Sequence, residues 1–428
     1  MEKVHTYGFE FLGGTDVMPI GGFYLPTPKS SDEVGFEMPD FITEKYFAMI
    51  AECGINLIVY NEVFYDTHAT YVEKMLELGE KYGIGITVSD RRLSNADGTL
   101  TLEKAKAAVE DYRYHKAFCG VYGVDEPTAD CYTGPKEHIS VYAPKMNYVA
   151  SLGIWAYGNL LPCYNEDYRE KYDKYVREWL DTCNVKMLMW DHYVHDKNVQ
   201  TIDYFYSLSY GRAMAEEYGI PFWTFIQAGS QWEAGSRRED SDGYYPNEGE
   251  FLWNVNTSLA YGAKGISYFP LIQPVSFTYA ASQPYDYERN GLIGASGNKN
   301  RWWHYAKKAN KQIAAIDEIL MNAVHQGVIV TSAQAKADNA DSLCVIEETA
   351  WRELAGITGD VMVGCFYYQG KSAFYVVNYD MQYAQNITLE FSDKYAFTVI
   401  QEAEIEKHKA NVLDLSIEAG EGVLVVME

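Results

Sequence analysis

One stretch of the chain ends a strand-like apolar run in two adjacent acids. Residues 118–124 read Phe-Cys-Gly-Val-Tyr-Gly-Val, and Asp125, Glu126 and Pro127 follow directly. A carboxyl group at the end of a buried strand is partly removed from water, which raises its pKa toward the range that a general acid needs. Pro127 cannot pair as a central strand residue, so the strand ends here. In the alternative interpretation, the two acids have no catalytic role and cap a following helix. The surrounding elements decide between these interpretations.

Helix-like segments in the first three quarters of the chain end in glycine and pass at once into an apolar strand. The pattern occurs at Gly54, Gly83, Gly153, Gly219 and Gly262. Glycine commonly ends helices, and such short connections are typical of α/β units. The predicted strands cover 20–25, 55–61, 84–90, 117–124, 154–161, 185–191, 220–227 and 264–271.

Eight strands that alternate with helices predict a (β/α)₈ TIM barrel of the α/β class over residues 1–322. A helix over 302–321 would close it. A doubly wound open sheet is the alternative, but no Gly-x-Gly-x-x-Gly follows the first predicted strand.

The pattern changes after residue 322 to alternating apolar and polar positions separated by turn residues. It is clearest over 327–330, 361–368, 371–377, 386–391 and 422–427. This alternation predicts a C-terminal antiparallel β-sandwich domain over residues 323–428.

Composition excludes several classes of partner. The formal net charge of −25 argues against nucleic acid and anionic membranes, both of which attract basic surfaces. Seven scattered cysteines without a Cys-x-x-Cys pair indicate free thiols in a reducing compartment. No apolar leader or run of about 18 apolar residues occurs, so we expect a cytoplasmic protein unless a signal peptide was trimmed.

The carboxyl ends of barrel strands meet at one face, where barrel enzymes hold their active sites. The predicted strand ends carry acids, amides and an arginine flanked by aromatic rings, as a sugar pocket needs. The catalytic candidates are Glu126, Asp125 and Asp191. The substrate-binding candidates are Asn61, Glu62, Asp90, Arg91, Asn159, Trp190, Tyr193, Trp223, Gln227, Glu233 and Tyr268.

Two other barrel chemistries fit less well. A sugar-phosphate site would have a glycine-rich loop after strands seven and eight, and Gly229 and Gly235 are too sparse for one. A metal site could draw on His192, His195, Asp191 and Asp90, but the His-x-His expected after strand one of metal-dependent amidohydrolase barrels is missing. We therefore expect no metal and no other cofactor.

The long segment 228–249 is expected to form a loop over the pocket. Its Arg237 and Arg238 either recognise an acidic sugar or are simply solvated charges.

The Asp125-Glu126-Pro127 run resembles the large clan of barrel glycoside hydrolases, whose acid/base glutamate follows strand four, commonly as Asn-Glu-Pro. The resemblance implies that Glu126 is the acid/base and that Asp125 replaces the asparagine that holds the sugar 2-hydroxyl. The segment 259–269 is also similar to the junction of helix seven and strand eight in uncharacterised barrel glycosidases.

The chain departs from that clan at strand seven. The clan's nucleophile glutamate should end this strand, where Gln227 offers an amide. Either Glu233 or Asp191 supplies the second carboxylate, or the mechanism uses no enzyme nucleophile. Asp191 has an alternative role as a salt-bridge partner of Arg91 or of another pocket residue.

A second resemblance is to hexosaminidases that work by substrate assistance and carry an Asp-Glu pair after strand four. It implies that Glu126 protonates the leaving oxygen while Asp125 orients the acetamido group of the substrate. Tyr193, Trp190 or Trp223 would then line an acetamido pocket.

The prediction is a glycoside hydrolase that cleaves O-glycosidic bonds of small oligosaccharides or glycosides, with carbohydrate as its partner. One alternative is the substrate-assisted N-acetylhexosaminidase. The other is a non-catalytic sugar-binding barrel, suggested by Gln227 where an acid is expected.

Overall fold

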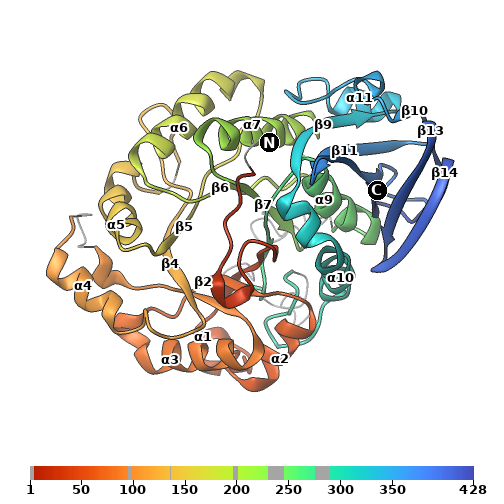
Figure 1. Cartoon of the computed structure of the whole chain (residues 1–428). Helices are drawn as coiled ribbons and strands as arrows, with labels where there is room; N and C mark the ends of the chain where they lie inside the picture. The colour runs from red at the N-terminus through yellow and green to blue at the C-terminus, as the bar shows by residue number, and fades with distance from the viewer. Residues whose placement is uncertain (1–3, 95–98, 135, 196–200, 230–244, 275–289) are drawn as a thin grey trace, which may run out of the picture.

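The computed structural model describes residues 4–94, 99–134, 136–195, 201–229, 245–274 and 290–428. Its first part is a barrel of parallel strands surrounded by helices (Figure 1). The barrel strands are β1 (Ile20–Leu25), β2 (Leu57–Asn61), β3 (Gly85–Val88), β4 (Phe118–Asp125), β5 (Trp155–Asn159), β6 (Leu188–Trp190), β7 (Phe222–Gln227) and β8 (Ile266–Phe269).

The eight strands lie in the order β5-β4-β3-β2-β1-β8-β7-β6. Leu160, directly after β5, closes the ring: its N–H donates to the carbonyl oxygen of Met189 at 2.8 Å, and its own carbonyl accepts from the N–H of Asp191 at 3.3 Å. Both faces of such a sheet are buried, which explains why the strands read as apolar runs. The predicted TIM barrel is confirmed.

Helices cover the outside of the barrel. They are α2 (Glu44–Glu52), α3 (Tyr65–Tyr82), α4 (Leu102–Glu110), α5 (Ile139–Ser151), α6 (Arg169–Thr182), α7 (Thr201–Tyr218), α9 (Glu248–Ala260) and α10 (Arg301–Asn322). The one-turn helix α1 (Ser31–Val34) follows β1 and has no buried residue. The predicted helix-ending glycines all have positive φ, and the N–H of Gly83 bonds the Gly79 carbonyl to end α3. This left-handed geometry is why glycine occupies these positions.

Aromatic side chains fill the barrel. Near the strand starts, Phe9 packs against Trp155 and Trp223, with ring centroids 4.9 and 6.3 Å away. The N-terminal segment thus plugs this end. Phe23, Tyr60, Tyr122 and their neighbours fill the rest.

A second sheet begins at Val324 and is antiparallel. Its strands are β9 (Val324–Val330), β10 (Leu354–Thr358), β11 (Val361–Tyr368), β12 (Lys371–Asn378), β13 (Gln385–Gln401), β14 (Glu404–Ile417) and β15 (Gly422–Met427), with the short helix α11 (Ala333–Asp338) after β9. The order is β10-β13-β15-β12-β11-β9, with β14 on β13. Residues 388–391 of β13 pair with β10, whereas 397–400 pair with β15, so β13 passes a bulge and turns from one layer to the other. The predicted sandwich is therefore one continuous sheet that curls around its own apolar core.

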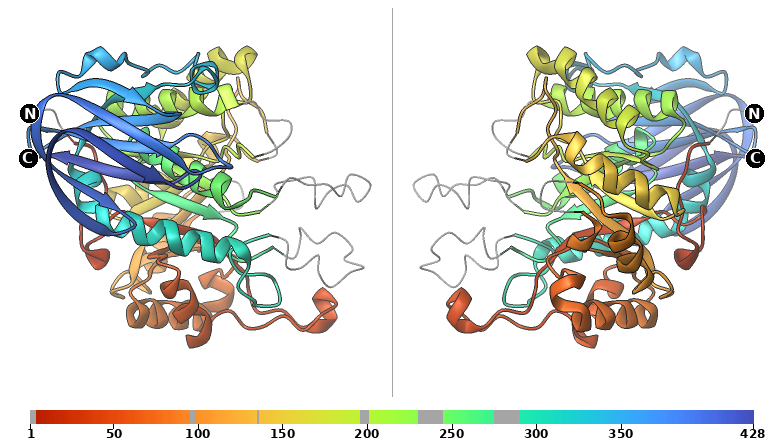
Figure 2. Two further views of the ribbon diagram at one scale, coloured as in Figure 1. Left: turned by 90° about the vertical axis from the view of Figure 1, so that its right-hand side faces the viewer. Right: turned by 90° about the vertical axis from the view of Figure 1, so that its left-hand side faces the viewer.

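The C-terminal sheet packs on the side of the barrel that α9 and α10 cover, toward the end where both chain termini lie (Figure 2). It leaves the carboxyl ends of the barrel strands uncovered. Among the described residues, no helix has the length and apolar character needed to cross a membrane.

Candidate active site

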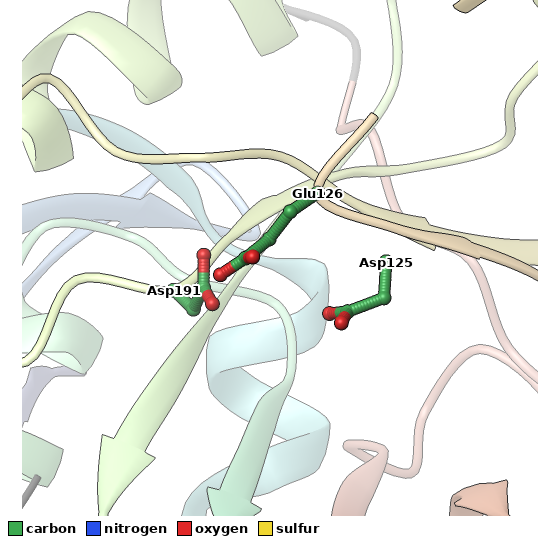
Figure 3. A group of neighbouring side chains, drawn as sticks. All are labelled: Asp125, Glu126 and Asp191. Atoms are coloured by element: carbon green, nitrogen blue, oxygen red, sulfur yellow. The ribbon is translucent and has the colours of Figure 1, made fainter. Parts of the chain in front are cut away.

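The end of β4 directs two neighbouring carboxyl groups to different sides. Asp125 is the last strand residue, and Glu126 adopts a left-handed backbone with φ of 49° immediately before Pro127. The Glu126 N–H donates to the Asn159 carbonyl at 3.0 Å, and the Pro127 carbonyl accepts from the Tyr175 hydroxyl at 2.6 Å. A left-handed non-glycine residue costs about 1–3 kcal/mol, so neighbouring bonds must hold this turn. The turn aims Glu126 toward β6 (Figure 3).

Asp191 meets Glu126 from the end of β6. Its side chain is buried, and the two carboxyl groups point toward one another, whereas that of Asp125 lies apart (Figure 3). One carboxylate oxygen from each of Asp125, Glu126 and Asp191 can be chosen so that all three lie within 4.8 Å of one another. The structure thus brings together the three catalytic candidates.

The environment keeps a proton on the Glu126 and Asp191 pair. Burial raises the pKa of Glu126, and the negative charge of Asp125 adds to this rise while a hydrogen bond with Asp191 opposes it. Burial raises the pKa of Asp191 well above its ordinary value, and the nearby charges of Glu126 and Asp125 raise it further. Two carboxylates at this distance cannot easily both ionise. One group therefore keeps its proton while the other carries the charge.

Asp125 has its own counter-charge. Its Oδ2 lies 3.3 Å from the Nζ of Lys136, which comes from the segment between β4 and α5. The Tyr60, Tyr122 and Tyr157 hydroxyls lie within electrostatic reach of Asp125, because its charge contributes to the raised pKa of each. Asp125 therefore faces the β2 to β5 side of the barrel.

Asn159 ends β5 directly beside Asp125, with which it pairs in strand register. Its side chain is fully buried, yet neither amide atom has a hydrogen-bond partner within the described structure. The Tyr157 hydroxyl, two residues earlier in the same strand, is also without a described partner. Buried polar groups normally find partners, so these atoms are available to a polar ligand.

Tyr193 provides an aromatic wall beside the acids. Its ring lies 5.7 Å from that of Phe269 and 6.2 Å from that of Phe225. Burial and the charges of Asp191 and Glu126 raise its pKa well above the ordinary value. This position agrees with the substrate-binding role predicted for Tyr193, which stays a prediction.

Three predicted aromatic ligands point elsewhere. Trp190 stacks on Phe222 and packs against Gly211 of α7. Tyr268 donates from its hydroxyl to Asn310 of α10 at 2.7 Å. Trp223 is fully buried at the plugged end of the barrel. The prediction for these three residues was wrong, because strand residues alternate in direction and Trp223 lies near the start of its strand.

The polar groups of several other candidates are already engaged. The Gln227 amide bonds both the N–H and the carbonyl of His195 at 3.0 Å, and the Gly229 carbonyl at 2.9 Å. The Asn61 amide bonds Thr87 and Val63. These hydrogen bonds give Gln227 and Asn61 structural roles in place of the predicted substrate contacts.

The charged candidates around β2 and β3 are either paired with a counter-charge or exposed. Asp90 is held by the Arg92 guanidinium at 2.8 Å, and Glu62 pairs with Lys29 at 3.2 Å. Arg91 is exposed and stacks over the Phe64 ring at 4.1 Å. It forms no ion pair with Asp191 within the described structure. Glu233, Arg237 and Arg238 lie outside the described residues.

Sequence reasoning missed Lys136, Tyr60 and Tyr157. Tyr157 could have been found, because it shares a strand face with Asn159. No sequence signal places Lys136 beside Asp125.

Metal binding is chemically open to the three acids, since carboxylate oxygens are ligands that Ca²⁺ and Mg²⁺ accept. The histidines considered as ligands are engaged elsewhere: His192 contacts Ser207 at 3.1 Å, and His195 Nε2 contacts the Glu250 carbonyl at 2.8 Å. A cation would also have to displace the proton shared by Glu126 and Asp191.

Comparison with protein-family models finds no match, and comparison with curated proteins finds none. Solved structures do resemble the chain. A β-galactosidase from Bacillus circulans sp. alkalophilus has a TM-score of 0.59 and 9% identity, covering 96% of this chain and 99% of that one.

Two further structures give the same picture. A catalytic mutant of Gan42B, a GH42 β-galactosidase from G. stearothermophilus, has a TM-score of 0.59 at 10% identity over 99% of both chains. A structure described as a glycoside hydrolase has a TM-score of 0.54 at 12% identity, over 96% of this chain and 92% of that one. The resemblance to barrel glycoside hydrolases is thus confirmed at the level of the fold.

Proposed function

We propose that this protein is a glycoside hydrolase that cleaves O-glycosidic bonds of small oligosaccharides or glycosides. The observation that carries the proposal is the facing pair of Glu126 and Asp191, two carboxyl groups delivered by two barrel strands, whose burial raises the pKa of each. A barrel that many glycoside hydrolases share supports it.

The carboxyl spacing favours a retaining mechanism. Retaining glycosidases hold their two carboxyl groups about 5 Å apart, whereas inverting enzymes leave about 6.5–9.5 Å for a water. One oxygen of each acid lies within 4.8 Å of the others, which is closer than the spacing that an inverting enzyme leaves for its water. Asp191 would replace the nucleophile that is missing at Gln227.

In the proposed reaction, the proton of the pair passes from Asp191 to Glu126 and then to the glycosidic oxygen, while an oxygen of the ionised Asp191 bonds the anomeric carbon and the glycosidic bond breaks. Glu126 then takes a proton from water, whose oxygen attacks the same carbon and releases Asp191. Each step needs one protonated and one ionised carboxyl group, which the pair supplies. Asn159 and Asp125 would bind sugar hydroxyls.

The substrate-assisted alternative assigns Asp125 to an acetamido group. The ion pair of Asp125 with Lys136, and the orientation of Asp191 toward Glu126, favour the first mechanism. A barrel that only binds sugar would not need the proton that Glu126 and Asp191 share.

Hydrolysis of nitrophenyl glycosides, with N-acetylhexosaminides beside plain hexosides, tests the proposal. We expect Glu126→Gln and Asp191→Asn each to lower kcat by at least about 100-fold, the scale of acid/base catalysis. Asp130→Asn is the matched control, because Asp130 is a fully exposed acid nearby. A fully active Glu126→Gln enzyme would overturn the proposal, and cleavage confined to acetamido sugars would favour the Asp125 mechanism.

A further inference from the structure

A cavity opens beside the acids because two neighbouring strands differ in length. β3 ends at Val88, which pairs with Val121, while β4 continues to Asp125. The last β4 residues therefore have no β3 neighbour on that side. A cavity of about 480 Å³ fills the gap between the end of β3 and helices α4 and α5.

The cavity lining is cationic in a chain whose net charge is −25. Arg91, Lys104 and Lys145 all line it. Its one described carboxylate, Asp90, is bonded by the Arg92 guanidinium through Nε at 3.1 Å and Nη2 at 2.8 Å. The Arg91 backbone N–H donates to Asp66 Oδ1 at 3.2 Å, but among the described residues the side chains of Arg91 and Lys104 form no ion pair, so their positive charge is available to a ligand.

Arg91 and Lys145 are held in place. The Arg91 guanidinium lies over the Phe64 ring, a contact that restricts its orientation. Lys145 donates to the Gly123 carbonyl at 2.5 Å, on the unpaired edge of β4. An ammonium group has three donors, so this bond leaves two for a ligand. Burial lowers the pKa of Lys145 to about 8, and the charge of Asp90 opposes that change.

The cavity adjoins the proposed catalytic site. Tyr122 lines it and packs against Tyr60, with ring centroids 4.5 Å apart. The Tyr60 hydroxyl lies within electrostatic reach of both Asp125 and Arg91, because both contribute to its shifted pKa. Gly123 precedes Asp125 by two residues, a separation of about 7 Å along a strand. A group attached to a sugar held at Asp125 could therefore enter the cavity.

We propose that this cavity binds an anionic substituent of the substrate, a carboxylate or phosphate carried by the sugar, through Arg91, Lys104 and Lys145. This inference rests on the proposed glycosidase function and narrows its substrate class to acidic glycosides. Arginine pairs well with both groups, because its planar fork matches their oxygens.

The test compares three series of nitrophenyl substrates, each in both anomers. They are the glucosides, the corresponding glucuronides and the glucoside 6-phosphates. We expect kcat/KM to favour at least one acidic series over the neutral one, and the series favoured identifies carboxylate or phosphate. Arg91→Gln and Lys104→Gln should each reduce this preference about 10-fold, the scale of one charge-assisted hydrogen bond. Lys106→Gln is the control, since Lys106 is exposed on the same helix and does not line the cavity.

Titration calorimetry with glucuronic acid, glucose 6-phosphate and glucose separates the two proposals. Binding of an acidic sugar that the Arg91→Gln, Lys104→Gln double variant loses supports the cavity, even if no glycoside is cleaved and the glycosidase proposal fails. Cleavage of neutral glycosides without binding or preference for either acid overturns the cavity proposal and leaves the glycosidase standing. If Lys106→Gln reduced the preference for acidic substrates as much as Arg91→Gln and Lys104→Gln do, the cavity proposal would also be overturned.

Discussion

Glu126 carries its carboxyl group on a left-handed backbone, locked between a strand and a proline. Ordinary strand geometry would point Asp125 and Glu126 to opposite faces of the barrel wall. The turn instead keeps both at the carboxyl end and lets Glu126 meet Asp191. Strain at one residue thus creates the pair that shares a proton.

The raised pKa of Asp191 predicts a pH-dependent stability. The folded protein holds a proton that an unfolded aspartate releases above about pH 4, so this group's stabilisation is complete below pH 4 and is lost as pH rises toward the folded pKa. The asparagine side chain of Asp191→Asn cannot release a proton, so this variant does not lose stability in this way as the pH rises. We expect the variant to melt about 2 °C or more above the wild type at pH 8.

Melting temperatures of both proteins between pH 4 and 8 check this prediction, with Asp130→Asn as an exposed control. The difference in melting temperature between Asp191→Asn and the wild type should become smaller toward pH 4. Parallel pH profiles would show that Asp191 is not held protonated.

Side-chain direction explains which site residues could be predicted from the sequence. The expectation that strand ends converge placed Glu126, Asp191 and Asn159 at one end of the barrel, where the structure has them. It also selected Trp190 and Tyr268. These two side chains face helices, whereas the residues next to them in the sequence face the site. Direction depends on where each strand bends or twists, and the sequence does not specify this.

At the element scale, Gln227 ties the end of β7 to the segment after β6. Its amide bonds both backbone groups of His195 and the Gly229 carbonyl, and the Gln227 N–H donates to Asn254 Oδ1 at 3.2 Å. His195 is four residues after Asp191. The amide that replaces an expected nucleophile thus supports the segment that supplies Asp191.

Loss of the hydrogen bonds of the Gln227 side chain should lower both the stability of the protein and its catalytic rate. Gln227→Ala leaves buried backbone groups of His195 and Gly229 unsatisfied, at a cost of about 3 kcal/mol in the free energy of unfolding. Small shifts of Asp191 should also lower kcat about 10-fold or more, because catalysis is sensitive to misplacement near 1 Å.

Urea unfolding and kinetics of Gln227→Ala measure both effects. Gln334→Ala serves for comparison, since its amide donates to Asp338 on the surface. If kcat stays unchanged while stability falls, other contacts position Asp191.

On the scale of the whole molecule, the C-terminal sheet belongs to two cores. Along β11 and β12, Met362, Phe366, Ala373, Tyr375 and Val377 join the core shared with the barrel helices. The alternate residues Val361, Val363, Cys365, Phe374 and Val376 fill the core of the sheet itself. Strands over both ranges were correctly predicted from the sequence. The sequence did not show which face meets the barrel, because both faces are apolar.

Close packing joins the sheet to α9, and Gly364 of β11 lies at one of the tight places. A Cβ at Gly364 would lie 2.4 Å from the carbonyl oxygen and 2.7 Å from the Cα of Ala260. These are backbone atoms and cannot move aside as a flexible side chain can. Gly364→Ala should therefore lower the free energy of unfolding by about 1–3 kcal/mol, as overpacking usually does.

Gly356→Ala is the matched control, because its Cβ would meet its nearest neighbour at 3.5 Å, an ordinary contact. Since barrel and sheet share a core, we expect the wild type and both variants to unfold in a single transition, with only Gly364→Ala shifted to lower urea. Calorimetry and urea titration followed by tryptophan fluorescence check this, because most described tryptophans lie in the barrel. A separate early transition of the sheet, or equal shifts for the two variants, would mean that the contact between Gly364 and Ala260 does not couple the two parts.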